Sequence, residues 1–230
     1  MPRMITVHHL ENSRSQRVLW LLEELGLPYE VRRYRRDPAT LLAPPELARV
    51  HPLGKSPVIT EGQGADAVTV AESGAIIEYL LDTHGAGRLR PAAGSPQRRQ
   101  FTYWLHFAEG SAMPYLVMKL VFDKVRDAPV PFFVKPIVKG IAQQVNRSFI
   151  APNLSRQLAF MEAHIVQQHW FAGSEFSAAD IQMSYPVEAT AVSGGLGTDH
   201  PALSGWLSRI HARAGYRRAL EMGGPYSVVP

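Results

Sequence analysis

The chain has 230 residues, of which 46% are hydrophobic and 19% are charged, and its formal net charge is +4. This balance is close to that of ordinary globular proteins and excludes a fibre or a wholly disordered chain, while the length suits one large domain or two small ones. The sequence contains no cysteine. This excludes disulfides, thiolate metal sites and a catalytic cysteine of the protein's own.

The basic excess is too dilute to indicate a nucleic-acid surface. Its densest run is Arg32, Arg33, Arg35 and Arg36. We interpret this run as the solvated end of a polar strand, because no second basic cluster lies near it in the sequence. The first residues lack the apolar stretch of a signal peptide, and no later stretch is long and apolar enough to span a bilayer. We therefore expect a cytoplasmic protein that binds neither nucleic acid nor membranes.

The first 85 residues predict a mixed α/β unit. Strands are indicated by short β-branched or alternating runs, and helices by apolar residues at helical spacing that end at glycine or proline. The predicted elements are strand 5–10, helix 18–25, strand 29–34, a short helix 44–50, hairpin strands 58–60 and 68–70, and helix 73–84. This order is βαβ, a short helix, then ββα, and its first helix is long enough for a parallel crossover.

The second part of the chain predicts only helices. Residues 86–96 concentrate Gly, Pro and Ala and predict a linker, so we place an α/β domain at 1–85 and an all-α domain at 97–230. The predicted helices are 101–125 with a kink at Pro114, 132–149, 154–170, 178–193, and 203–220 with a break near Gly215.

One helix start and the histidines are assigned no catalytic role. Ser177 and Asp180 form a capping-box pattern at the start of helix 178–193, and these residue types are fully explained by local hydrogen bonds. The nine histidines lack HExxH spacing, and His164 and His169 are five residues apart, off the helical stripe that a metal would need. We therefore expect no metal site.

Four segments together resemble the cytosolic glutathione transferase superfamily. They are VHHLENSRSQRVLWLLEELGLPYE, HPLGKSPVI, ESGAIIEYLL and FSAADI, and they follow the family's order over essentially the whole chain. The first is most similar to the serine-type members of the bacterial and fungal branch. The resemblance implies a thioredoxin-like N-terminal domain joined to an all-helical C-terminal domain, which agrees with the order of predicted elements.

The resemblance also implies a glutathione site formed by Lys55, Ser56, Pro57, Glu72 and Ser73. The family has a cis proline at the position of Pro57, which turns the main chain of the preceding residue toward the cysteinyl part of glutathione, so we predict a cis bond. Lys55 suits a carboxylate of the tripeptide, the alternative being an exposed loop lysine. Glu72 and Ser73 stand where a strand becomes a helix, a junction that attracts a carboxylate, and Glu72 can pair with an ammonium group. The alternative at Ser73 is a simple N-cap.

Ser13 is the predicted thiol-activating residue. It precedes Arg17 by four residues, as the activating hydroxyl does in serine-type members, and Asn12, at the position of the cysteine in cysteine-type members, is the second candidate. Ser13 to Gln16 also has the pattern of a capping box for the next helix. Both roles are compatible, because a hydroxyl that accepts a helix N–H can still donate its proton to sulfur.

The activity implied by the resemblance is attack of the glutathione thiolate on a small hydrophobic electrophile. Peroxide reduction as a side activity, dehalogenation and the identity of the electrophile are left open. Lining residues for the electrophile are expected near Pro114, the alternative for each being ordinary helix packing: Phe107, Ser111, Tyr115 and Met118. The resemblance further implies a homodimer, a role in detoxification, and no cofactor other than glutathione as cosubstrate. The alternative function is a non-catalytic, transferase-like binding protein.

Overall fold

The computed structural model describes residues 3–227. Its N-terminal part is built on a four-stranded sheet of order β2-β1-β3-β4. The strands are β1 (Ile5–Leu10), β2 (Tyr29–Tyr34), β3 (Val58–Glu61) and β4 (Val68–Ala71). β1 and β2 run parallel, whereas β3 is antiparallel to both of its neighbours. The predicted strands and the hairpin are therefore confirmed, with one more residue at the end of β3 and of β4.

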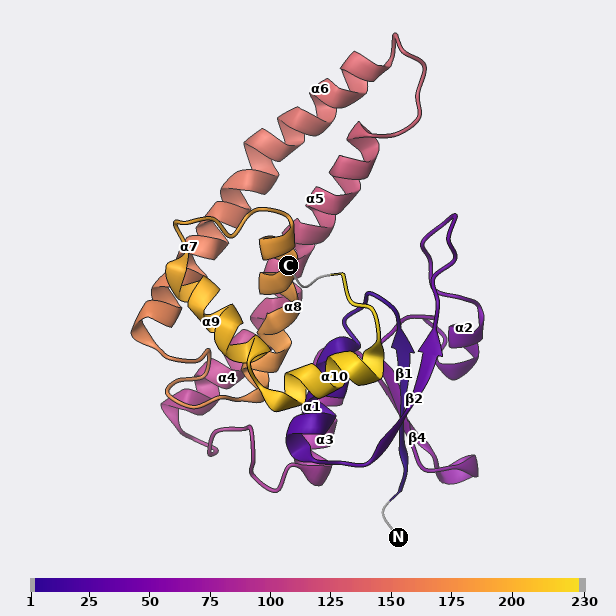
Figure 1. The fold of residues 1–230 in the computed structure, drawn as a ribbon, viewed down its shortest axis with the longest axis vertical. Helices are drawn as coiled ribbons and strands as arrows, with labels where there is room; N and C mark the ends of the chain where they lie inside the picture. The colour runs from indigo at the N-terminus through magenta and orange to yellow at the C-terminus, as the bar shows by residue number, and fades with distance from the viewer. Residues whose placement is uncertain (1–2, 228–230) are drawn as a thin grey trace.

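Helices cover both faces of this sheet. α1 (Gln16–Leu25) and α3 (Ser73–His84) lie on the face that looks toward the rest of the chain, and the short α2 (Glu46–Val50) lies on the other (Figure 1). Successive side chains of β1 point to opposite faces of the sheet, which explains why helices cover both faces. Ile5 and Val7 join the main core, whereas Leu10 packs with Tyr34 and Leu47 beneath α2. This is the thioredoxin-like arrangement that the sequence predicts.

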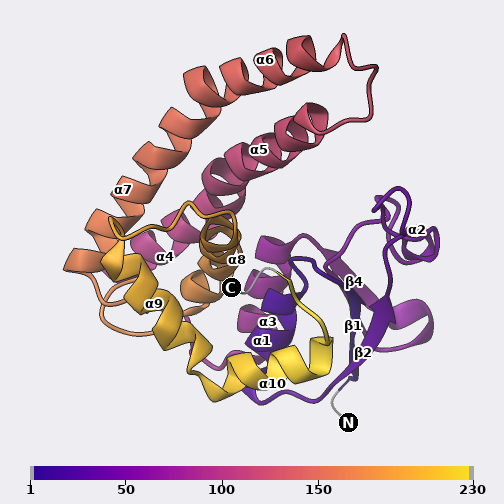
Figure 2. The ribbon, with the colours of Figure 1, turned by 45° about the horizontal axis from the view of Figure 1, so that its top comes forward.

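The C-terminal part is helical throughout. Its elements are α4 (Pro96–Phe107), the π-helical η2 (Ala108–Ala112), α5 (Met113–Arg126), α6 (Lys135–Val145), the π-helical η3 (Asn146–Ile150), α7 (Ala151–Gln167), α8 (Ala178–Val192), α9 (Pro201–His211) and α10 (Ala214–Gly223). α5 and α6 form a hairpin that extends away from the remaining helices (Figure 2). None of the helices within residues 3–227 is long and apolar enough to cross a membrane.

The structure corrects one predicted break and relocates another. We expected separate helices at 132–149 and 154–170, but α6 begins at Lys135 and the chain stays helical through η3 to the end of α7. Pro152 lies in the first turn of α7, just after the π-helical turn, where its missing N–H is tolerated. A kink was expected at Pro114. The structure has the π-helical η2 directly before α5, and Pro114 lies in the first turn of α5.

The capping box at Ser177 is confirmed and ties three elements together. The Ser177 hydroxyl accepts the N–H of Ala179, and Asp180 accepts the N–H of Ser177 at 3.0 Å. Asp180 also accepts from the Phe171 N–H (2.9 Å) and the Trp206 indole (3.0 Å). Burial raises the pKa of this carboxyl to about 6. These contacts join the α7–α8 loop, α8 and α9, which fits the structural role expected for this motif.

Candidate functional site

A small polar cleft lies where the loop before β3 meets the start of α3. Its volume is about 120 Å³. Its lining residues are Arg14, His51, Leu53, Lys55, Ser56, Pro57, Ala71, Glu72 and Ser73. The structure therefore brings all five residues expected to bind glutathione into one cleft, although they come from two segments of the sequence.

The loop side of this cleft presents main-chain groups. The Ser56–Pro57 peptide bond is cis, as predicted. The Ser56 hydroxyl donates to the carbonyl of His8 (2.9 Å) and accepts from the N–H of Leu10 (3.2 Å), so the side chain is held by β1. Within residues 3–227 no hydrogen bond occupies the N–H or C=O of Ser56. These two groups are thus free to pair with an extended ligand.

The helix side of the cleft presents a carboxylate beside the N-terminus of α3. Glu72 is exposed and is the N-cap residue of α3, with a φ of 72°, a left-handed conformation that is uncommon for residues other than glycine. Ser73 follows it, buried, and its hydroxyl accepts from the Arg17 guanidinium at 3.0 Å. The first N–H groups of α3 have no partner within the helix, so this end of the cleft favours a ligand carboxylate.

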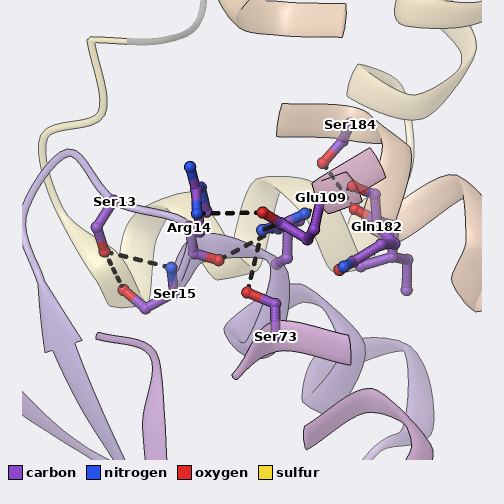
Figure 3. Close-up of polar contacts among 9 residues, drawn as sticks. Ser13, Arg14, Ser15, Ser73, Glu109, Gln182 and Ser184 are labelled. Carbon is purple, nitrogen blue, oxygen red and sulfur yellow. Dashed lines mark hydrogen bonds and ion pairs between the residues drawn. The ribbon is translucent and has the colours of Figure 1, made fainter. Parts of the chain in front are cut away.

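Arg17 connects this cleft to the helical domain through contacts with Ser73, Glu109 and Gln182, which Figure 3 labels. Its buried guanidinium donates to the carbonyl of Gln182 on α8 (2.7 Å) and pairs with Glu109 of η2 (2.5 Å), in addition to Ser73. Glu109 also pairs with Arg14 (3.1 Å). The sequence contains no signal for Glu109 beyond an acidic residue between two apolar stretches, and its role follows only from its ion pairs with Arg14 and Arg17 in the folded chain.

Ser13 is buried at the start of α1 and belongs to a chain of hydrogen bonds. Its hydroxyl lies 2.7 Å from the Ser15 hydroxyl and accepts the N–H of Ser15 at 3.2 Å. The Ser15 hydroxyl in turn lies 2.8 Å from Nδ1 of His9. The capping box expected for this helix is wrong, because the N-cap residue is Ser15, the Ser13 hydroxyl accepts from Ser15 and not from the N–H of Gln16, and the Gln16 side chain is buried without a hydrogen-bond partner in the described part of the chain. Ser13 instead forms a tight turn with Ser15.

His9 supports this chain as a neutral ring. Burial lowers the pKa of His9 to about 4, and the nearby charge of Arg33 acts in the same direction, against the opposing effects of a hydrogen bond to the Gly223 backbone and of Glu11. A neutral imidazole has a single N–H, so at neutral pH the ring holds Ser15 without adding a charge next to Ser13. Neither His9 nor Ser15 was identified from the sequence.

Asn12 lines neither of the clefts described for this protein. Its side-chain oxygen accepts from the N–H (2.7 Å) and the hydroxyl (3.1 Å) of Ser227, and its φ is 51°. The C-terminal segment thus occupies this side chain. Of the two candidates for thiol activation, only Ser13 lines a cleft.

A second, largely apolar cleft of about 390 Å³ adjoins the first and shares Arg14 and Ser56 with it. One wall is formed by α5 residues that recur at i, i+3, i+4 and i+7, and the opposite side by α8 and by the start of α1. The lining residues are Ser13, Arg14, Arg36, Ser56, Met113, Leu116, Val117, Lys119, Leu120, Asp123, Tyr185, Ala189 and Ser193.

The four residues expected to line an electrophile site do not line this cleft. Phe107 is buried against Trp104 and Phe160, the carbonyl of Ser111 accepts from Gln157, and Tyr115 packs on Phe149. Met118 lies on the same face of α5 as Tyr115. Tyr115 and Met118 thus lie on the helix that forms the wall of the cleft but not among its lining residues, whereas Phe107 belongs to α4 and Ser111 to η2.

No group of three His, Asp or Glu side chains within residues 3–227 comes together in a way that could hold a metal ion. The groups that the two clefts offer a ligand are therefore hydrogen-bonding and charged groups and an apolar wall.

Comparison of this chain with known proteins indicates its family. Residues 13–83 match the family described as "Glutathione S-transferase, N-terminal domain", and residues 128–214 match "Glutathione S-transferase, C-terminal domain". The chain is 32% identical to Glutathione S-transferase 1 of Saccharomyces cerevisiae, covering 95% of this chain and 94% of that protein, and 32% identical to Glutathione S-transferase 3 of Schizosaccharomyces pombe, covering 95% and 87%. A glutathione S-transferase structure from Actinobacillus pleuropneumoniae superposes with a TM-score of 0.77 at 30% identity, covering 97% of this chain and 94% of that one. The chain belongs to the glutathione S-transferase family.

Proposed function

We propose that this protein binds glutathione in the polar cleft, activates its thiol beside Ser13, and transfers it to an electrophile held in the apolar cleft. One observation carries the proposal: the two clefts share Arg14 and Ser56, and Ser13, the residue before Arg14, lines the apolar cleft. A sulfur atom held there is within reach of a molecule bound against α5. A pure binding module has no need for this second, apolar space next to the thiol, so the non-catalytic alternative is not favoured.

The polar cleft supplies a partner for each part of the tripeptide. The γ-glutamyl group carries an ammonium and a carboxylate, which suit Glu72 and the start of α3 respectively. The cysteinyl main chain suits the free N–H and C=O of Ser56. Lys55 is exposed at the loop end of the cleft, and its cation suits the remaining carboxylate of the ligand.

Thiol activation follows from the position of Ser13. A free thiol has a pKa of about 8.5 and is only a few per cent thiolate at neutral pH. A hydroxyl donor together with the N-terminus of α1 can lower that pKa by about two units, which corresponds to about 2.7 kcal/mol of thiolate stabilisation. The thiolate then forms a bond to the electrophilic carbon as the leaving group departs with its electron pair.

A solved relative supports the choice of ligand. A glutathione transferase family member from Pseudomonas fluorescens, described as having two glutathione molecules bound, is 26% identical to this chain with a TM-score of 0.72, covering 94% of this chain and 92% of that one. We extend that ligand to this chain, with glutathione as cosubstrate and no further cofactor. Peroxide reduction at the same thiolate is a side activity to be assayed with an organic hydroperoxide.

We further propose that the protein is a cytoplasmic homodimer. Within each chain, we propose that the boundary between the two domains lies at residues 86–96. Large exposed apolar side chains concentrate on the α5–α6 hairpin, for example Phe132, Phe133 and Ile137, which are 86%, 67% and 62% exposed. Such a patch favours association with another chain. Light scattering during gel filtration tests this proposal, and a monomer at micromolar concentration would reject it.

The proposed activity is tested by retention on immobilised glutathione followed by an assay of chlorodinitrobenzene conjugation. We expect retention, elution by free glutathione, and saturable turnover. Retention without turnover would indicate the binding role instead. Absence of retention would overturn the assignment of the polar cleft.

A further inference from the structure

The mouth of the apolar cleft carries an excess of positive charge. Its lining includes Arg14, Arg36 and Lys119 but only one acidic residue, Asp123. Arg14 is paired with Glu109 at 3.1 Å. A pocket for neutral, hydrophobic compounds has no need for these cations. Their charge acts on a ligand only where no carboxylate of the protein is paired with it.

Arg36 is held rigidly by main-chain carbonyls. Its guanidinium donates to the carbonyls of Glu11 (3.3 Å), Asn12 (3.3 Å) and Leu41 (2.9 Å). The Glu11 carboxylate accepts from the backbone N–H of Arg36 (2.9 Å), and within residues 3–227 no carboxylate forms an ion pair with the guanidinium. A guanidinium has five N–H groups, so two remain for a ligand. Arg36 is thus a cation fixed in place, without an ion-pair partner for its guanidinium in the described part of the chain.

Lys119 adds to this charge from the opposite wall. Lys119 pairs with Asp123 at 2.6 Å, but Asp123 is shared with Arg126 at 2.9 Å. Arg126 in turn pairs with Asp127 at 2.7 Å, and the single bond to Asp123 leaves two N–H groups of the Lys119 ammonium for a ligand. Because Lys119 is only about one-third exposed, its charge acts on the cleft with less screening than a fully solvated lysine would.

We infer that the electrophile cleft is specific for electrophiles that carry an anionic group, a carboxylate or sulfonate on a flat apolar body, with the acid bound by Arg36 and flanked by Lys119. This inference rests on the proposed function. Arg36 binds the carbonyl of Asn12, the neighbour of Ser13, and both Arg36 and Ser13 line the apolar cleft, so an acid group at Arg36 lies in the same cleft as the proposed thiolate. The apolar wall from Met113 to Leu120 spans about 10 Å and covers the ring.

The test uses two electrophiles of the same shape, a chlorodinitrobenzoate and the corresponding chlorodinitrobenzamide. Each kcat/KM is divided by the uncatalysed rate with glutathione, which removes the difference in intrinsic reactivity. We expect the protein to prefer the benzoate about tenfold, because a charge-assisted hydrogen bond is lost with the amide. The preference should decrease as salt is added.

Substitutions of Arg36 and Lys119 test which residue causes the preference for the benzoate over the benzamide. Lys119→Met should lower it about threefold and Arg36→Met should remove it, with the KM for glutathione unchanged in both. Lys124→Met, on the same helix but outside the cleft, is the matched control and should leave the preference intact. Arg36→Lys, which retains the charge, should keep part of the preference and guards against a misfolded Arg36→Met.

Two outcomes would overturn the inference. The first is equal normalised rates for the benzoate and the benzamide in the unaltered protein. The second is an Arg36 effect confined to the KM for glutathione, which would place that cation on the tripeptide. Turnover of the benzamide keeps the proposals separate: conjugation without a preference rejects only the anionic specificity, whereas no conjugation of either compound rejects the proposed function itself.

Discussion

The two clefts of this protein differ in what builds them. The polar cleft is made of main-chain groups and mostly polar side chains of the loop before β3 and of the junction between β4 and α3, and apart from Arg14 its residues come in two compact sequence segments, 51–57 and 71–73. The apolar cleft is made of one face of α5 opposite α8 and the start of α1, elements far apart in the sequence. A binding site that pairs with its ligand through the main chain can therefore be predicted from a local sequence motif. A ligand that needs an apolar wall depends on how helices rotate against one another.

The largest expected effect concerns Ser13, the residue next to the Arg14 that both clefts share. Ser13→Ala should raise the pH at which bound glutathione ionises by about two units and lower kcat/KM about 100-fold, because a preorganised donor to the charged atom is lost. Titration of thiolate absorbance and a pH–rate profile measure both. Asn12→Ala is the control and should change neither, since that side chain is bound to Ser227. An unchanged profile for Ser13→Ala would move the role to Asn12 or to the backbone.

The second prediction concerns the buried support of the polar cleft. The pKa of His9 is about 4 in the folded protein, below its ordinary value of 6.5, so unfolding takes up a proton at this residue as the pH falls. Its contribution to stability is complete above pH 6.5 and is lost toward pH 4. Between pH 7 and 5 we expect a loss on the order of 2 kcal/mol, measured by urea unfolding.

His9→Gln isolates this effect, because the glutamine does not titrate and the part of the pH dependence that belongs to His9 should disappear. A parallel decline in the variant and in the unaltered protein would contradict the prediction.

The third prediction separates glutathione binding from electrophile binding. Glu72→Gln should raise the KM for glutathione about tenfold, because a charge-assisted contact to the ammonium group is lost, while the KM for the electrophile stays the same. Glu78→Gln, on the same helix but outside the cleft, makes the same change of charge and should leave both constants unchanged. An equal effect of both variants would mean that only net charge matters.

The smallest expected effect tests the face of α5 that forms the apolar wall. Leu116→Ala should raise the KM for a hydrophobic electrophile about fivefold without changing that for glutathione, since contact area in the apolar cleft is lost. Met118→Ala removes a similar side chain from the neighbouring face and should change neither constant. Thermal unfolding of both variants separates binding from stability. If Met118→Ala had the larger effect, the face expected from the sequence would be the right one.

The difference between the clefts explains which site residues could be predicted. Ser56, Pro57, Glu72 and Ser73, which the family resemblance implies as glutathione-binding residues, lie together in the polar cleft, where a strand start and a helix start place their main-chain groups. Phe107, Ser111, Tyr115 and Met118 were expected in the electrophile site because they lie near Pro114. A helix offers several faces, and the packing of the helices against one another decides which face meets the cleft.

The sequence by itself determined the order of the elements, the sheet of the N-terminal part, the capping box of α8 and the segments that surround the polar cleft. These features depend on contacts within a few residues or on the alternation of a strand, which the chain carries locally. Only the tertiary structure decided that α6 and α7 form one continuous path, that His9 and Ser15 support Ser13, that Asn12 turns to Ser227, and that Arg36 and Lys119 meet at one cleft. Each of these pairs residues from distant elements, and a contact between distant elements is set by packing, which a linear pattern does not contain.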